Sequence, residues 1–491
     1  MRAFALSPIF RSKLHRRSTA WLALTGLGLL VVAARAERPI MESHIEEFRQ
    51  WMSGRAKIVG AQEVALTSQQ ALGAALYSDP NLSLNRNQSC ATCHSLAPAK
   101  DAASGQSLPT AGFVDPRNII PGIFVSNGSV PEKTGMLNAP SVGYAAFSPS
   151  FRWNKATGRF EGGLFWNGRA ATLQDQAALP ILNPVEMAMP GKWAVVTRLK
   201  ENAAYRNGFK KLYKVDLDAI PANENAPAEA KAPRAVADAM AAATRAIAEF
   251  EKSRVFNRFT SKFDFYLAGM TDLTPREKAG LALFVGKAAC ATCHTAEPAL
   301  TADGKPFPPL FTDFTYENIG LPPNPFIPGN PPPDLGLGAR PEIKRRPKAA
   351  LELGKHKTMS LRNIAITPPY GHNGVFQSLE SIMHFYNTRD SLGQVGLGDS
   401  GFGVTGWPAP EYAETVNRDN EAGAMNLTDE EEAAVVAFMK TLTDDYPQTA
   451  GDPQVPPGTP SPFPDAVPGG GALRPFSGKG KPAAKRAASN E

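Results

Sequence analysis

The sequence reads Cys90-Ala-Thr-Cys93-His94 at one place and Cys290-Ala-Thr-Cys293-His294 at another. These two copies of one pentapeptide, the first motif and the second motif below, contain all four cysteines of the 491-residue chain. No cysteine is therefore left over for a separate structural disulfide. The two motifs decide how the rest of the sequence is interpreted.

The pattern Cys-x-x-Cys-His is the attachment motif of c-type haem. Its two thiols add to the haem vinyl groups, and the adjacent imidazole takes an axial position on the iron. A redox disulfide would not need the following histidine twice. A zinc site would need further ligands, which a chain without spare cysteines supplies poorly. The sequence therefore predicts two covalently bound haems c, with His94 and His294 as iron ligands.

Helix-start signals accompany both motifs. The capping boxes Thr67–Gln70 and Thr274–Glu277 each open an apolar helix that leads into a motif, and Thr428–Glu431 opens a third helix. The shared order indicates an internal duplication. Because proline (44) and glycine (42) are abundant, long irregular connections are expected. We expect a mainly α fold of two cytochrome c-type haem domains with long Pro/Gly-rich loops.

The two ends of the chain differ from its middle. Residues 1–36 carry six basic residues, no acidic residue, an apolar run and a small-x-small site, which is typical of a secretory signal peptide. An uncleaved anchor is the alternative. We expect an N-terminal, peroxidatic haem domain over 37–255 and a C-terminal, electron-transfer haem domain over 256–446. A disordered Pro-rich and basic tail would follow over 447–491.

The charge pattern limits the partners. The formal charge of +6 equals the six basic residues of the signal, so the remainder is neutral overall. A neutral chain without a basic stripe argues against nucleic acid, which is bound through clustered Lys and Arg. We expect a periplasmic protein without stable membrane insertion.

The second axial ligand of each iron decides what the protein can do. Ser378 predicts a helix start, and Met383 and Tyr386 follow with Leu379 on one helix face. His384 points roughly 140° away from Leu379 at 100° per residue, so it is a poor candidate. Either Met383 or Tyr386 could reach an iron, and either could instead be a core residue.

Further segments accompany the two motifs: Gly163-Leu-Phe-Trp166-Asn-Gly-Arg169, Asn183-Pro-Val-Glu186-Met, and Leu361-Arg-Asn with Tyr370-Gly-His372-Asn-Gly. In this order they resemble the bacterial di-haem cytochrome c peroxidase/MauG superfamily. The resemblance covers roughly residues 65–445. It does not cover 37–60, 217–234, 321–347 or the tail.

The resemblance implies that Tyr386 ligates the C-terminal haem, as in the MauG branch, with Met383 as the alternative. A tyrosinate ligand would favour ferric iron, because a hard anionic oxygen prefers the higher charge. Peroxidases of the family carry a distal His shortly after the first motif. The region around Thr110 has none, which implies a five-coordinate N-terminal iron open to peroxide.

The resemblance also implies site roles. Glu186 would shuttle a proton during peroxide cleavage, Trp166 would relay electrons between the haems, and Gln176 and Pro180 would line the distal pocket. Arg362 and His372 would face haem propionates. A calcium ion would bind between the domains through oxygen atoms of Asn138, Thr367 and Pro369.

These expectations describe an exported oxidoreductase that reacts with hydrogen peroxide at the N-terminal haem. Oxidising equivalents would pass through Trp166 and the C-terminal haem to a redox partner. That partner would be a small cytochrome, a cupredoxin or a protein substrate oxidised in the MauG manner. The alternative is a di-haem electron carrier without peroxide chemistry, which would need His44 or His356 as an extra ligand.

Overall fold

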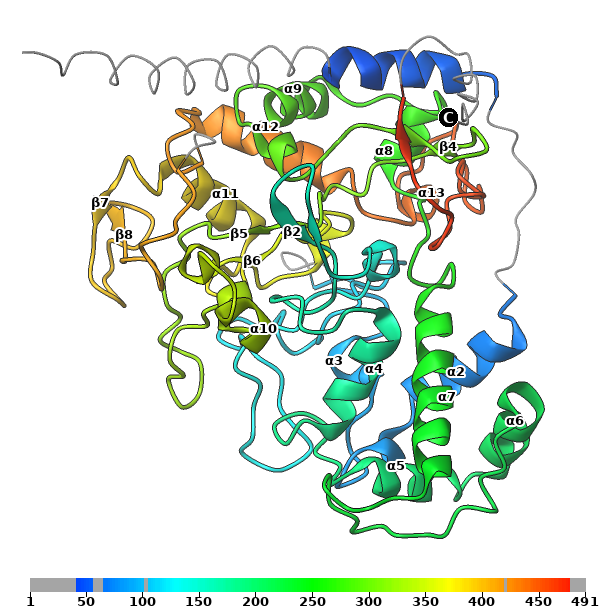
Figure 1. Cartoon of the computed structure of the whole chain (residues 1–491). Helices are drawn as coiled ribbons and strands as arrows, with labels where there is room; N and C mark the ends of the chain where they lie inside the picture. Colours follow the sequence, from blue (N-terminus) through cyan, green and yellow to red (C-terminus); the bar gives the residue numbers. More distant parts are fainter. Residues whose placement is uncertain (1–40, 56–64, 101–104, 419–421, 477–491) are drawn as a thin grey trace, which may run out of the picture.

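The computed structural model describes residues 41–55, 65–100, 105–418 and 422–476 (Figure 1). The signal expected over residues 1–36 lies outside these residues. Helices dominate the regular structure, which confirms a mainly α fold. The α-helices after the helix over residues 41–52 are α2 (Ser68–Tyr77), α3 (Cys90–Cys93), α4 (Leu173–Leu182), α5 (Lys192–Leu199), α6 (Ala203–Tyr213), α7 (Arg234–Glu251), α8 (Lys262–Leu267), α9 (Pro275–Val285), α10 (Pro341–Lys344), α11 (Leu379–Thr388), α12 (Asp429–Lys440) and α13 (Tyr446–Thr449).

The strands are two or three residues long and form small sheets. In the described part of the chain, one sheet has three strands in the order β4-β3-β9. The other sheets are strand pairs: β1-β2 and β5-β6 are antiparallel, and β7-β8 is parallel. The strands are β1 (Arg152–Asn154), β2 (Arg159–Glu161), β3 (Ala299–Leu300), β4 (Pro306–Phe307), β5 (Tyr316–Glu317), β6 (His356–Lys357), β7 (Gly393–Gln394), β8 (Gly406–Trp407) and β9 (Arg474–Pro475).

The predicted helix starts are confirmed. Thr67, Thr274 and Thr428 each cap a helix, and in each case the residue three positions later returns a hydrogen bond to the cap backbone. Ser378 caps α11 in the same way. These reciprocal bonds satisfy backbone N–H groups that a helix start leaves without intrahelical partners. Local sequence therefore fixes where these helices begin.

One helix pair occurs twice. Helix α2 packs on α7, and α9 packs on α12. Gly73 and Gly280 occupy the same position after their N-caps. A Cβ atom would lie 1.9 Å from the carbonyl oxygen of Ala246 at the first crossing and of Ala434 at the second. Glycine therefore permits both close crossings. The equivalence supports the internal duplication that the sequence suggested.

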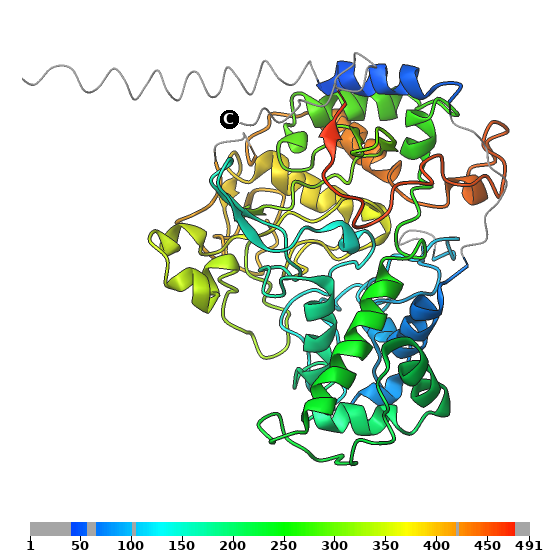
Figure 2. The same cartoon turned by 45° about the vertical axis from the view of Figure 1, so that its right-hand side comes forward.

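Two apolar cores lie one above the other in Figures 1 and 2, the N-terminal one below. The N-terminal core is built mainly from α2, α4, α5, α6 and α7. The C-terminal core is built mainly from α8, α9, α11 and α12. Their largest fully buried side chains include Tyr77, Phe209 and Phe256 in the first core and Phe263, Phe284 and Phe311 in the second.

The helix over residues 41–52 corrects the predicted domain boundary. Ile45, Phe48 and Met52 are buried in the C-terminal core, so this helix does not belong with the N-terminal half. Both views place it beside α9, far from α2 (Figures 1 and 2). Its apolar spacing at i, i+3 and i+7 gives a helix face, but spacing cannot say which core that face covers.

The predicted disorder of the tail is wrong for residues 447–476. Phe463 and Phe476 are 0% and 2% exposed, and their rings lie 6.5 and 5.2 Å from the ring of Phe48. Strand β9 pairs with β3. A few aromatic anchors suffice here because a proline-rich backbone has little conformational freedom to lose on docking. Average composition missed those anchors. Residues 477–491 lie outside the described residues.

No helix in the described parts of the chain is both long and apolar enough to cross a bilayer.

Candidate active site

A single cavity of about 750 Å³ is lined by both motifs and by residues of both halves. It contains the side chains of Cys90, Cys93 and His94 on one part of its wall and those of Cys290, Cys293 and His294 on another. None of the four cysteines is in a disulfide. Thiols, imidazoles and a large, mainly apolar space together match what two covalently attached haems require.

Both motif histidines are oriented for ligation. His94 Nδ1 lies 3.3 Å from the carbonyl oxygen of Phe113, and His294 Nδ1 lies 2.9 Å from that of Phe311. Donation from Nδ1–H to a carbonyl leaves the Nε2 lone pair available to a metal. Burial lowers the pKa of both imidazoles, which favours the neutral, ligating form. The chain therefore fits two haems c.

Helix α11 brings both candidate ligands of the C-terminal haem to the cavity. Tyr386 and Met383 line the same space as His294. Burial raises the pKa of the Tyr386 phenol, so a phenolate there needs a nearby positive charge, which ferric iron would supply. The geometry does not choose between the two, and Tyr386 stays a prediction. His384 bonds to Glu432, 3.0 Å away, and is not among the lining residues.

Helix α4 and the turn after it carry the residues that are expected on the distal side of the N-terminal haem. Gln176, Pro180 and Glu186 line the cavity together. The Asn183 side chain caps this turn and donates from Nδ2 to Glu186 Oε1 over 2.8 Å. Burial raises the pKa of Glu186, while the Arg169 charge and the Asn183 bond act in the opposite direction. A carboxyl with a raised pKa is suited to exchanging protons near neutral pH.

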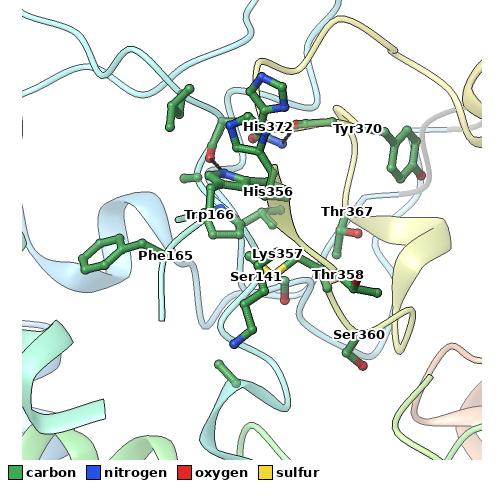
Figure 3. A pocket seen from close by; sticks show the side chains of 18 of the residues that line it. Ser141, Phe165, Trp166, His356, Lys357, Thr358, Ser360, Thr367, Tyr370 and His372 are labelled. Carbon is green, nitrogen blue, oxygen red and sulfur yellow. Dashed lines mark hydrogen bonds between the residues drawn. The ribbon is translucent and has the colours of Figure 1, made fainter. Parts of the chain in front are cut away.

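Trp166 lies on the cavity wall and is held at three points. Its indole N–H donates to the Asn138 carbonyl oxygen over 2.8 Å, and its own carbonyl accepts from the Lys357 N–H over 2.7 Å. The His372 ring lies edge-on, 6.4 Å from the indole. Figure 3 shows the indole beside the imidazoles and the side chain of Lys357 below it. The indole is fixed and partly buried, which suits an electron relay.

The residues proposed for calcium are partly together. Asn138 Nδ2 donates to the Pro369 carbonyl over 2.7 Å, and Thr367 lines the same cavity. Amide and carbonyl oxygens suit a hard cation. An ion would require the amide to turn so that Oδ1, rather than Nδ2, faces Pro369. No cluster of three His, Cys or carboxylate side chains able to hold a metal exists among the described residues.

Both expected propionate partners already bind carboxylates of the chain. Arg362 donates to both oxygens of Asp264 over 2.9 Å and also to the Pro309 carbonyl. His372 Nε2 lies 2.6 Å from Glu411 Oε2. Arg362 therefore offsets the buried charge of Asp264, and its charge is not free for a propionate. Both propionate roles stay predictions.

Two lining residues, Lys357 and Glu251, escaped the sequence analysis, and a third, His356, was considered there only as an extra haem ligand of an electron carrier. His356 stacks on His372 with ring centres 3.5 Å apart and bonds to Asp334. Burial lowers the pKa of Lys357 to about 7, and its ammonium donates to Ser148 and Gly163. Glu251 ends α7. A signal existed for Glu251, because it follows Ile247 by four residues on the apolar face of that helix. Two-residue strands such as β6 give no such signal.

Two haem-attachment motifs on one cavity, with a carboxyl group and an indole on its wall, define a di-haem c-type cytochrome. Comparison with known proteins shows to which family of di-haem cytochromes the chain belongs. The family model described as di-haem cytochrome c peroxidase matches residues 67–272. The methylamine utilization protein MauG of Paracoccus denitrificans is 37% identical over 379 residues, which is 76% of this chain and 88% of that protein. The chain belongs to the di-haem cytochrome c peroxidase and MauG family.

Other relatives agree. Cytochrome c peroxidase Ccp of Escherichia coli is 31% identical over 67% of this chain and 56% of that protein. The diheme peroxidase BthA of Burkholderia thailandensis superposes with a TM-score of 0.60 and 28% identity, over 78% of this chain and 88% of that one. The protein is therefore a peroxide-reactive di-haem oxidoreductase of the peroxidase type, with two c-type haems. The alternative of an electron carrier without peroxide chemistry is less supported.

Proposed function

We propose that the protein is exported to the periplasm and reacts with hydrogen peroxide in the N-terminal part of the cavity. Oxidising equivalents pass by way of Trp166 and the C-terminal haem to a redox partner protein. The observation that carries this proposal is the single cavity that both motifs, Trp166 and Glu186 line together. One shared space allows proton transfer at one haem and electron transfer to the other within the same cavity.

The two haem sites are proposed to differ in ligation. The chain has no histidine between His94 and His294, and the described distal residues Gln176, Pro180 and Glu186 include no imidazole. In the C-terminal half, Tyr386 lines the same cavity as His294. An open iron would suit peroxide, and a phenolate-ligated iron would suit the storage of an oxidising equivalent.

Bound haem supplies an iron that coordinates peroxide and exchanges electrons one at a time. Glu186 would take the proton from one oxygen of hydrogen peroxide and deliver it to the other, which would leave as water, and the haem that His94 would hold would supply the electrons that cleave the O–O bond. Asn183 holds the carboxyl for this transfer. Pro180 cannot ligate and keeps space clear for the oxidant. Asn138 fixes the indole of Trp166, and a calcium ion at Asn138, Thr367 and Pro369 would stiffen that contact.

The partner is proposed to be a protein that is oxidised in the MauG manner, because Tyr386 takes the place of the methionine ligand of the peroxidases. Peroxidase turnover with a small cytochrome or a cupredoxin as donor is the second candidate. It is favoured by the resemblance to cytochrome c peroxidases over two thirds of the chain.

The test is spectroscopic, with the haem-loaded ferric protein. The wild type should show one high-spin and one low-spin haem, and hydrogen peroxide should perturb both. Tyr386→Phe should abolish the low-spin signal, whereas the matched variant Met383→Leu on the same helix should keep it. The opposite pattern would make Met383 the ligand. Two low-spin haems that stay so after reduction and ignore peroxide would overturn the proposed function.

A further inference from the structure

Glu251 is an acidic residue buried beside the first motif. It is the last residue of α7, it is 4% exposed, and it lines the same cavity as Cys90. Its Oε2 atom has no hydrogen-bond partner among the described residues. A buried carboxylate without a partner is strongly disfavoured. No donor of the described protein stabilises the charged form of this carboxyl group. Binding a proton would therefore lower its energy.

Among the described residues, no charged group offsets the Glu251 carboxylate, since burial is the cause of its raised pKa. Helix α7 packs on α2, which contributes Tyr77, and the first motif contributes Cys90. The pKa values of the Tyr77 hydroxyl and the Cys90 thiol are both raised. Burial is the largest cause in each case, and the negative charge of Glu251 is the second largest. The charge of Glu251 is therefore felt at the atom that anchors the haem. The Tyr77 hydroxyl cannot serve Glu251 as it stands, because it donates to the His94 carbonyl over 3.0 Å.

We propose that Glu251 is a proton-binding site coupled to the charge of the N-terminal haem. When that haem accepts one electron from an external donor, the Glu251 carboxylate binds one proton from solvent. When the haem gives up the electron, the carboxyl releases the proton. This inference rests on the haem attachment at Cys90 described above and goes beyond the proposed function, which assigns Glu251 no role.

The direction of the coupling follows from electrostatics. Burial alone raises the pKa of Glu251 to about 8, and no described cation opposes the shift. Ferric haem carries the more positive charge and favours the carboxylate, whereas reduction removes one positive charge and favours the protonated acid. The pKa is thus higher in the reduced protein. Between the two pKa values each electron brings a proton, so the net charge of the buried site does not change.

The effect matters for turnover because peroxide reduction consumes protons as well as electrons. Glu186 handles a proton at the distal side. Glu251, at the end of α7, would bind the proton that offsets the charge of the electron arriving near Cys90. A charge-compensated electron enters a low-dielectric cavity more readily than an uncompensated one.

The experiment is a spectroelectrochemical titration of the full-length, haem-loaded protein between pH 5 and 10. The wild-type midpoint potential of the N-terminal haem should fall as pH rises above the pKa of the oxidised protein. The limiting slope is a tenfold change in the equilibrium constant per pH unit, or about 59 mV for one electron. Glu251→Gln is neutral throughout. Its potential should match the wild type at low pH, stay flat, and exceed the wild type at high pH.

Glu249→Gln is the matched control, two residues earlier on the same helix. Glu249 pairs with Lys252 over 2.8 Å at the surface, so this variant should keep the wild-type slope. The inference is overturned if Glu251→Gln keeps the slope or if the wild type shows none. Mass spectrometry of covalent haem and the peroxide reaction of the wild type are measured separately. A missing peroxide reaction with an intact slope would defeat the proposed function and leave this inference standing.

A second measurement on the wild type keeps the inference testable if the variant does not fold. Redox difference infrared spectroscopy above pH 8 should show a protonated carboxyl band that appears on reduction and shifts in deuterium oxide. Absence of such a band would overturn the inference.

Discussion

At the scale of single residues, the environment of Glu186 decides its chemistry. The side chain is largely buried, and it accepts one hydrogen bond from Asn183 while Arg169 supplies the nearest opposing charge. Burial is the larger influence and raises the pKa. A base must lose its proton before it can accept another, so the peroxide reaction should slow as pH falls through this raised pKa.

Glu186→Gln should slow the reaction with hydrogen peroxide by about 10²–10⁴-fold and remove that acid limb, because an amide cannot shuttle a proton. Stopped-flow absorbance in the haem bands measures both effects. Glu132→Gln, at an exposed position, should leave rate and pH profile unchanged. An unaltered rate in Glu186→Gln would remove the residue from the mechanism.

Sequence reasoning at this scale succeeded where the chemistry is local. The pentapeptides specify attachment without reference to anything distant, and the structure places all six of their reactive side chains on one cavity. Sequence reasoning could not decide whether Tyr386 or Met383 is the iron ligand. Both lie on one helix face, and the direction of the iron depends on packing. Sequence reasoning also did not foresee the pairing of Arg362 with Asp264, because the two residues lie 98 positions apart in the sequence.

At the scale of elements, the two glycine crossings are the tightest helix contacts described. Gly73→Ala and Gly280→Ala would each force a methyl group against a carbonyl oxygen of the facing helix. The helices must then separate, and overpacking of this kind costs about 1–3 kcal/mol or more. Both variants should lower the melting temperature of the haem-loaded protein, followed by circular dichroism.

Gly208→Ala is the control for those variants. It lies within α6, and its nearest contact would be a flexible Leu72 side chain at 3.4 Å. Alanine is the better helix former by roughly 1 kcal/mol, so this variant should melt at or above the wild-type temperature. Equal melting of all three variants would show that the crossings are not tight in solution.

The starts of four helices could be predicted from the sequence, whereas the short strands could not. A capping box is complete within four residues, so Thr67, Thr274, Thr428 and Ser378 could be recognised directly. By contrast, β9 pairs with β3 across most of the C-terminal half. Two-residue strands carry no periodicity, and their existence depends on where the cores bring the backbone.

At the scale of the whole molecule, segments from the two ends of the described chain complete one core. The helix over residues 41–52 and the segment 447–476 meet through Phe48, Phe463 and Phe476. Figure 1 shows both beside the C-terminal half. Composition suggested a tail too poor in apolar residues to fold. The error arose because burial depends on a few well-placed rings, and a mean over thirty residues conceals them.

Phe463→Ala should destabilise the C-terminal half by about 3–5 kcal/mol, the cost of removing a fully buried phenyl ring. Val467→Ala, four residues later and 46% exposed, should change stability by less than about 0.5 kcal/mol. Chemical denaturation followed through the absorbance of each haem measures the difference. A similar small effect for both substitutions would mean that the tail does not support the core.

The same meeting of distant segments constrains the order in which the newly made polypeptide can mature. The N-terminal core draws only on residues up to about 256, so it can close before the C-terminal half has folded. The other core uses Phe48 and Phe476 together, and it must stay incomplete until nearly the whole chain has emerged.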